Sequence, residues 1–255
     1  MGDNLLEILK EAYKKFSLPN YIIKEEKNNE GVDGHVVSYV DRNSYVAEQF
    51  KILRTNLYSL SPEKPLQTIA ITSSQLEEGK TLIVSNIAAT LAQDTEKKTL
   101  LVDADLRKPK VHSLFGLAQK PGLEDILQGN ATLELFLRKP AIGNLYIIPS
   151  GTTAINPSDI LSPTKIKALL EQLKAKFDFI ILDTPPALNV SDAGIIGALC
   201  DAVFLVVRSG VTPKNIVEEG FNALKDAHAK PKACILNDVL FTPLNYYQTK
   251  YKKYY

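Results

Sequence analysis

Two hydrophobic patterns alternate along most of the chain. Short apolar, β-branched runs, typical of buried strands, are separated by segments whose apolar residues recur every three or four positions, as in amphipathic helices. The predicted strands cover residues 67–73, 98–103, 145–149, 178–183, 202–207 and 232–237, and the predicted helices cover residues 80–94, 163–176 and 213–228. Short helical pieces are expected through residue 127. This alternation predicts an α/β fold: a doubly wound, mainly parallel sheet with helices on both faces.

The N-terminal part of the chain has a different pattern. Residues 4–16 are predicted to form a short amphipathic helix, which we expect to pack on its own domain or on a neighbour rather than on a membrane. Residues 17–41 are rich in Lys, Glu, Asn and Gly without a sustained period, which indicates a linker. A helix over residues 43–59 follows, with an apolar stripe on one side.

The last ten residues contain five of the eleven tyrosines of the chain and no aliphatic residue. Such a segment cannot bury itself, so we predict a flexible Tyr-rich tail. Its tyrosines are Tyr246, Tyr247, Tyr251, Tyr254 and Tyr255. The predicted organisation is therefore an N-terminal helix and linker (1–41), one α/β domain (42–240) and the tail (241–255).

Composition narrows the function only slightly. The 255 residues carry a net charge of +1, so no general affinity for polyanions is indicated. No apolar run is long enough to cross a bilayer, and the N-terminus does not resemble a secretory signal. The two cysteines, Cys200 and Cys234, lie in apolar surroundings, which favours buried thiols over a disulfide or metal site.

The segment from residue 68 to residue 81 carries the main candidate chemistry. An apolar strand runs into a polar loop that ends in Gly79-Lys80-Thr81, where a helix is predicted to begin. Backbone N–H groups, a helix N-terminus, a lysine and a hydroxyl are what a nucleotide phosphate loop needs. Its usual first glycine is replaced by Ser74, and a Gly-Lys-Thr triplet alone also occurs in ordinary loops. The candidate cofactor-binding residues here are Ser74, Gln75, Leu76, Glu77, Glu78, Gly79, Lys80, Thr81 and Leu82.

Carboxylates follow two other predicted strands. Asp103 ends the strand at 98–103, Asp105 follows it, and Asp183 ends the strand at 178–183. An aspartate at the end of a strand can be a simple turn residue or helix cap. The carboxyl ends of parallel strands meet at one edge of the sheet, however, so we expect all three to face the phosphate loop.

With these motifs and the tail, the chain resembles the bacterial tyrosine kinases of capsule and exopolysaccharide biosynthesis, which have a P-loop fold related to the MinD and ParA ATPases. The resemblance extends from residue 45 to residue 255. The matching segments are residues 48–57, 73–81, 101–109, 122–127, 177–186, 191–193 and 206–212, together with the tail.

The resemblance implies a reaction and a set of roles. ATP and Mg²⁺ would be the cofactors, with Lys80 on the β and γ phosphates and Thr81 on the metal. Asp183 would orient the metal's water shell. Of Asp103 and Asp105, one would accept the tyrosine proton and the other would bind the metal shell; the family favours Asp103 as the base. Arg208 and Asn237 are further candidates for contacts around the nucleotide base.

The resemblance also implies partners. The five tail tyrosines would be phosphorylated in trans within a ring-like homo-oligomer, with an octamer as its expected size, held by a helix carrying Glu48, Lys51 and Arg54. A membrane activator of the polysaccharide co-polymerase type and an opposing tyrosine phosphatase would be its partners. The chain would then be cytoplasmic, peripheral to the inner face of the membrane, and would regulate polysaccharide synthesis and export.

Some positions depart from the family pattern. Leu76-Glu77 replace Pro-Gly, Lys51 replaces an arginine, and Leu82 replaces a small hydroxyl residue. These departures leave two alternatives open: a catalytically weak nucleotide-binding scaffold, and an ATPase similar to MinD or ParA. The latter carry an extra lysine near the start of the loop, where this chain has Ser74-Gln75. Nucleic-acid binding by the basic aromatic tail has the least support, and no nucleic-acid partner is expected.

Overall fold

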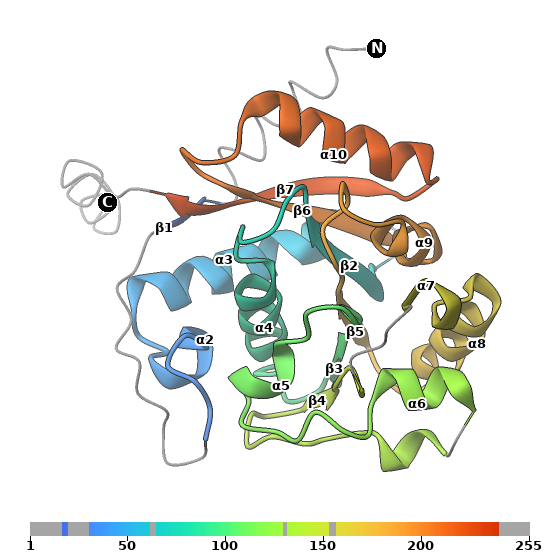
Figure 1. Ribbon diagram of the computed structural model, residues 1–255. Helices are drawn as coiled ribbons and strands as arrows, with labels where there is room; N and C mark the ends of the chain where they lie inside the picture. Colours follow the sequence, from blue (N-terminus) through green and yellow to red (C-terminus); the bar gives the residue numbers. More distant parts are fainter. Residues whose placement is uncertain (1–16, 20–30, 62–64, 130–131, 153–156, 240–255) are drawn as a thin grey trace.

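The computed structural model describes residues 17–19, 31–61, 65–129, 132–152 and 157–239. A sheet of parallel strands in the order β1-β7-β6-β2-β5-β3-β4 forms its centre (Figure 1). The strands are β1 (Ser17–Pro19), β2 (Thr68–Ser73), β3 (Thr99–Asp103), β4 (Leu145–Ile148), β5 (Phe179–Asp183), β6 (Ala202–Arg208) and β7 (Pro231–Val239). The predicted doubly wound parallel sheet is therefore confirmed.

Helices cover both faces of this sheet (Figure 1). They are α2 (Val37–Val40), α3 (Tyr45–Ser59), α4 (Lys80–Leu91), α5 (Val111–Leu114), α6 (Leu123–Gln128), α7 (Pro157–Ile160), α8 (Pro163–Lys174), α9 (Asp192–Leu199) and α10 (Lys214–Asp226), with a 3₁₀ turn, η1, at Leu133–Leu135. One hydrophobic core lies under α2, α3 and α4, and the second lies under α6, α8, α9 and α10.

The central strands are buried on both faces, which is why they appear in the sequence as continuous apolar runs. Every residue of β2, β3 and β5 is buried. Strand β5 lies between β2 and β3, and its register places Asp183 opposite both Ile71 and Asp103. Two of the three predicted acidic residues thus lie side by side next to the end of β2, where the phosphate loop begins.

Helix α9 was not predicted from the sequence. Its two glycines, Gly194 and Gly197, lower helix propensity and obscure the apolar period. The fold uses them for close packing, because a Cβ at Gly194 would lie 2.6 Å from the Cβ of Ala227, and one at Gly197 would lie 2.8 Å from Cγ2 of Val203. Tertiary contact therefore stabilises a helix that the local sequence disfavours.

The described residues 31–41 differ from the linker expected there. Val36 and Val37 are buried in the core beneath α3 and α4, and residues Val37–Val40 form α2. The side chain of Asn86 on α4 fastens this segment, because its Oδ1 accepts from Ser38 N at 2.9 Å and its Nδ2 donates to His35 O at 2.9 Å. The expectation was wrong for these residues, because a four-residue helix is too short to show a period.

Cys200 and Cys234 are buried and free, as expected, and burial raises the pKa of both thiols to about 12. Within the described residues, no helix is both long and apolar enough to cross a membrane. The helix predicted over residues 4–16 and the five tail tyrosines lie outside the described residues, so these remain predictions.

Candidate functional site

The loop between β2 and α4 has the geometry of a phosphate loop. Gly79 precedes the first residue of α4 with φ +85°, a left-handed conformation that favours glycine. A Cβ at this position would also lie 2.2 Å from Nδ2 of Asn237, so a larger residue would displace the Asn237 side chain. The loop therefore delivers the N-terminus of α4, with its free N–H groups and positive dipole end, to the rim of the sheet.

Ser74, at the position of the missing first glycine, is completely buried at the base of this loop. It fits because α10 has a glycine opposite it: a Cβ at Gly220 would lie 2.4 Å from Oγ of Ser74. The chain after β5 also holds this base, because Ala187 N donates to Ser73 O at 2.8 Å. The serine is thus accommodated because α10 has no side chain at Gly220.

Lys80 connects the loop to the acidic residues. Its Nζ lies 2.8 Å from Oδ2 of Asp105 and 3.4 Å from Oδ1 of Asp183. The hydroxyl of Thr81 donates to Oδ2 of Asp183 at 2.7 Å. The predicted convergence of lysine, hydroxyl and carboxylates is therefore present in the structure.

Asp103 lies beside this cluster with one oxygen free. Its Oδ2 accepts from Val111 N at 3.1 Å, and its buried Oδ1 has no hydrogen-bond partner among the described residues. Burial, and then the neighbouring Asp183 carboxylate, raise the pKa of Asp103 well above its ordinary value. A carboxyl group with a raised pKa and a free oxygen is suited to accepting a proton.

The charges of the cluster shift the pKa values of its other members too. Burial raises the pKa of Asp183 although Lys80 and the Thr81 hydroxyl oppose the change. Burial by itself would lower the pKa of Lys80, but the carboxylates of Asp183 and Asp105 outweigh it and raise that pKa. Lys80 is therefore a firmly charged ammonium between two buried acids.

These residues also fit a magnesium nucleotide. Mg²⁺ takes oxygen ligands, and in nucleotide sites it is held by one or two protein groups together with phosphate oxygens and water. Thr81, Asp105 and Asp183 supply such oxygens beside the loop. Among the described residues, no three His, Cys, Asp or Glu side chains are grouped closely enough to hold a metal ion by themselves.

The two candidates for base contacts lie at the ends of β6 and β7. Asn237 reaches the loop, where its Nδ2 donates to Glu78 O at 3.0 Å. Arg208 is engaged elsewhere, because its Nε pairs with Oδ2 of Asp238 at 2.8 Å. The structure thus brings Asn237 to the phosphate loop and holds the guanidinium of Arg208 against its neighbouring strand.

Two residues were given no role from the sequence. They are Thr212 and Asp192, and Oδ2 of Asp192 pairs with Nε of Arg107 at 3.0 Å. Both lie in segments that match the family pattern, 191–193 and 206–212, so this match could have identified them as candidates.

Glu77 shows what the departure from Pro-Gly does to the loop. It has φ +64°, in the left-handed region that glycine adopts freely and that a side chain disfavours. Leu76 beside it is 44% exposed, so neither side chain is needed for packing. Leu82 lies past the loop, in the first turn of α4.

We expect Glu77→Gly to stabilise the protein by up to about 1 kcal/mol, because the left-handed strain disappears while the unfolded chain gains some freedom. Nucleotide affinity is expected to rise as well, since one carboxylate near the phosphates is removed. Glu77→Ala is the matched control: it removes the charge and keeps the strain, so denaturant unfolding should show no gain. Equal stability of the two variants would contradict the strain argument.

The three helix charges assigned to ring formation have partners within the chain. On α3, Lys51 Nζ lies 3.2 Å from Oε2 of Glu48 and 3.1 Å from Arg42 O. Arg54 reaches across to α4 and donates from Nη1 to Thr90 O at 3.1 Å. Their role in oligomerisation stays a prediction.

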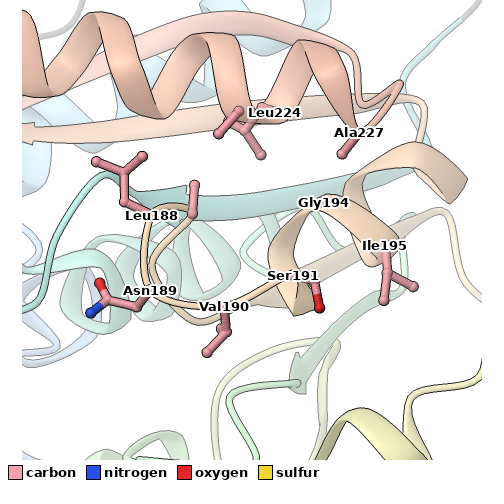
Figure 2. Close-up of a pocket in the computed structure, with 10 residues that line it drawn as sticks. Leu188, Asn189, Val190, Ser191, Gly194, Ile195, Leu224 and Ala227 are labelled. Carbon is pink, nitrogen blue, oxygen red and sulfur yellow. The ribbon is translucent and has the colours of Figure 1, made fainter.

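A separate cavity of about 560 Å³ lies between α10 and the segment that leads into α9. Figure 2 shows Leu224 of α10 and Ala227, just after this helix, on one side of it, and Leu188 and Gly194 on the other. The predicted site residues do not line this cavity. Its lining is mainly apolar, in contrast to the charged phosphate-loop site.

Known proteins share both the sequence and the fold. Residues 66–227 match the family model described as an AAA domain. The tyrosine-protein kinase YwqD of Bacillus subtilis is 35% identical over 203 residues, which are 80% of this chain and 85% of that protein. The tyrosine-protein kinase ptk of Acinetobacter johnsonii is 33% identical over 218 residues; the match covers 86% of this chain and 29% of that longer protein.

Solved structures of known proteins share the fold of this chain. The kinase domain of the Escherichia coli tyrosine kinase ETK superposes with a TM-score of 0.81 at 28% identity, covering 89% of this chain and 90% of that one. The septum site-determining protein MinD of Pyrococcus horikoshii, solved with Mg-ADP, has a TM-score of 0.58 at 27% identity, covering 67% and 70%. Since the match to YwqD spans most of both proteins and the kinase domain superposes over nearly the whole chain, the chain belongs to the bacterial tyrosine-protein kinase family.

Proposed function

We propose that this tyrosine kinase uses Mg-ATP to phosphorylate the tyrosines of its own C-terminal tail, on a neighbouring copy of the chain. The observation that carries the proposal is the cluster at the phosphate loop. Lys80 and Thr81, at the start of α4, contact Asp105, just after β3, and Asp183, at the end of β5, and Asp103 keeps a free oxygen beside them. The tail supplies five phenols within ten residues.

Catalysis of phosphoryl transfer depends mainly on positioning the reactants and neutralising the phosphate charge, so each contact of the cluster can be assigned a role. Lys80 would bind the β and γ phosphates, and the N–H groups at the start of α4 would cradle them. Thr81 would bind Mg²⁺ directly, while Asp183 and Asp105 would hold the water around it. Bound Mg²⁺ would neutralise charge on the phosphate oxygens.

In the present structure Lys80 acts as the counter-ion of Asp105 and Asp183. In the presence of Mg-ATP, Lys80 would turn from these acids to the phosphates, and the Thr81 hydroxyl would leave Asp183 to bind the metal.

Asp103 would serve as the general base. A phenol has a pKa near 10 and is a poor nucleophile at neutral pH, so it needs an acceptor for its proton. The free Oδ1 of Asp103 is that acceptor. Since the carboxyl group is fully buried, the residues around it would have to move before a phenol reaches it.

Transfer to the tail of a neighbouring copy requires the copies to assemble. The tail of one copy would enter the site of the next in a ring-like homo-oligomer, with α3 and its residues Glu48, Lys51 and Arg54 at the contact. A membrane activator would hold the ring at the inner face of the cell membrane, and a tyrosine phosphatase would reverse the reaction. Phosphate on the tails adds negative charge, which would loosen the ring by repulsion and so regulate polysaccharide synthesis and export.

Mapping of phosphate by mass spectrometry tests the proposal. The purified full chain is incubated with Mg-ATP, with and without a segment of a membrane activator, beside a variant in which Tyr246, Tyr247, Tyr251, Tyr254 and Tyr255 are all changed to Phe. We expect phosphate on the tail tyrosines of the wild type and none on the tail of the variant. Mixing the Phe variant, which keeps Lys80, with Lys80→Met, which keeps the tail tyrosines, tests transfer between copies, because only such transfer can then modify a tail.

Two other outcomes would refute the proposal in favour of the alternatives. Release of inorganic phosphate without tyrosine modification would indicate an ATPase of the MinD type. Binding of Mg-ATP in a calorimetric titration, with neither tyrosine modification nor phosphate release, would indicate a nucleotide-binding scaffold with weak turnover. The three measurements use the same protein preparation and together separate the three functions.

A further inference from the structure

Glu78 is a buried carboxylate inside the phosphate loop, although a negative charge there lies close to the position expected for a polyanion. It is 3% exposed and directly precedes Gly79-Lys80-Thr81. A buried carboxylate is retained at low cost only when hydrogen bonds satisfy its oxygens. The partners of Glu78 therefore show what it does.

Both carboxylate oxygens are hydrogen bonded. Oε2 accepts from Gln75 N at 2.8 Å, which closes the loop on itself. Oε1 accepts from the hydroxyl of Thr212, in the segment between β6 and α10. The first bond shapes the loop, and the second joins it to a part of the chain 134 residues away.

The segment around Thr212 is itself fixed. The Thr212 N–H donates to Arg208 O at 3.0 Å, and its hydroxyl oxygen accepts from Arg208 N at 3.3 Å. Beside it, the end of β7 holds the same loop residue by its backbone, because Nδ2 of Asn237 donates to Glu78 O. Glu78 is therefore fastened by its side chain to the end of β6 and by its carbonyl to the end of β7.

We propose that Glu78 and Thr212 are positioning residues for the nucleotide. Their bond aligns the loop that would bind the phosphates with the ends of β6 and β7, where Arg208 and Asn237 are the candidates for contacts with the base. The inference rests on the proposed nucleotide function of the loop. It assigns to the carboxylate of Glu78 a role in nucleotide affinity and none in the chemical step.

Thr212→Val tests the bond because valine has nearly the same shape and lacks the hydroxyl. Oε1 of Glu78 loses its partner in a buried position, so the loop is expected to shift and Mg-ADP affinity, measured by calorimetry, to fall about tenfold. KM for Mg-ATP should rise by the same factor, while kcat stays within twofold. Thr212→Ser keeps the hydroxyl and should restore affinity to within twofold of the wild type.

A double-mutant cycle separates positioning from general stability. If Thr212 acts through the carboxylate, Thr212→Val has no further effect on Mg-ADP affinity once Glu78→Ala is present. Thr55→Val, which removes an exposed hydroxyl bonded within α3, is the matched control and should leave affinity unchanged. Thermal unfolding of each nucleotide-free variant shows that it is folded.

Wild-type affinity for Mg-ADP in folded Thr212→Val, or equal losses from Thr212→Val with and without Glu78→Ala, would overturn the inference. Mg-ADP binding involves no tyrosine acceptor. A wild-type protein that binds Mg-ADP and transfers no phosphate would therefore refute the proposed kinase mechanism without affecting this test.

Discussion

Lys80→Met is expected to reduce tail phosphorylation by a factor of about 10³ or more, because it removes the positive charge that would neutralise the transferred phosphates. Phosphotyrosine formed from Mg-ATP measures the loss. Lys167→Met, on the exposed face of α8, is the matched control and should keep full activity. Activity within tenfold of the wild type in Lys80→Met would exclude the assigned role of this lysine.

The same substitution is expected to destabilise the protein. Lys80 is the counter-ion of Asp105 and Asp183, so its loss leaves two buried carboxylates without a counter-ion, at a cost of about 3–5 kcal/mol. Burial already raises the pKa of Asp183, and loss of the ammonium would raise it further. A group whose pKa is higher in the folded than in the unfolded state loses stability as pH rises. Urea unfolding should therefore show a larger deficit at pH 8 than at pH 5.

Asp103→Asn is expected to reduce phosphorylation by a factor of about 10² to 10⁴, the range for loss of a general base, while making the protein more stable. The amide cannot accept the phenol proton, but its oxygen can still accept from Val111 N. Asp226→Asn, at the exposed end of α10, is the matched control and should change neither property. Retention of activity within threefold in Asp103→Asn would transfer the role of base to Asp105.

The greater stability expected of Asp103→Asn depends on pH. The folded-state pKa of Asp103 is raised above its ordinary value of 3.8. The stability that its neutral form contributes is therefore complete below that value and is lost as pH rises through the folded-state pKa. Asparagine is neutral at every pH, so the advantage of the variant should grow from pH 4 upward. If the difference in unfolding free energy between Asp103→Asn and the wild type stayed constant from pH 4 upward, this would contradict the raised pKa of Asp103.

The sequence predicted the α/β architecture because buried parallel strands appear as continuous apolar runs, which the β2, β3 and β5 segments show. The site was also predictable in part. Parallel strands end at one edge of the sheet, so Asp103 and Asp183 had to approach the phosphate loop. Boundaries were less well predicted: α4 ends at Leu91, three residues before the predicted end at 94, because a helix end depends on its capping contacts.

The sequence by itself thus determined the order of strands and helices along the chain, and the loop and acids at their ends, because local periodicity encodes burial. Tertiary structure alone decided which groups meet. The ion pair of Lys80 with Asp105, the space that Gly220 leaves for Ser74, and the bond between Glu78 and Thr212 join residues 25, 146 and 134 positions apart. Such contacts depend on how elements pack in three dimensions, and one-dimensional periodicity carries no information about them.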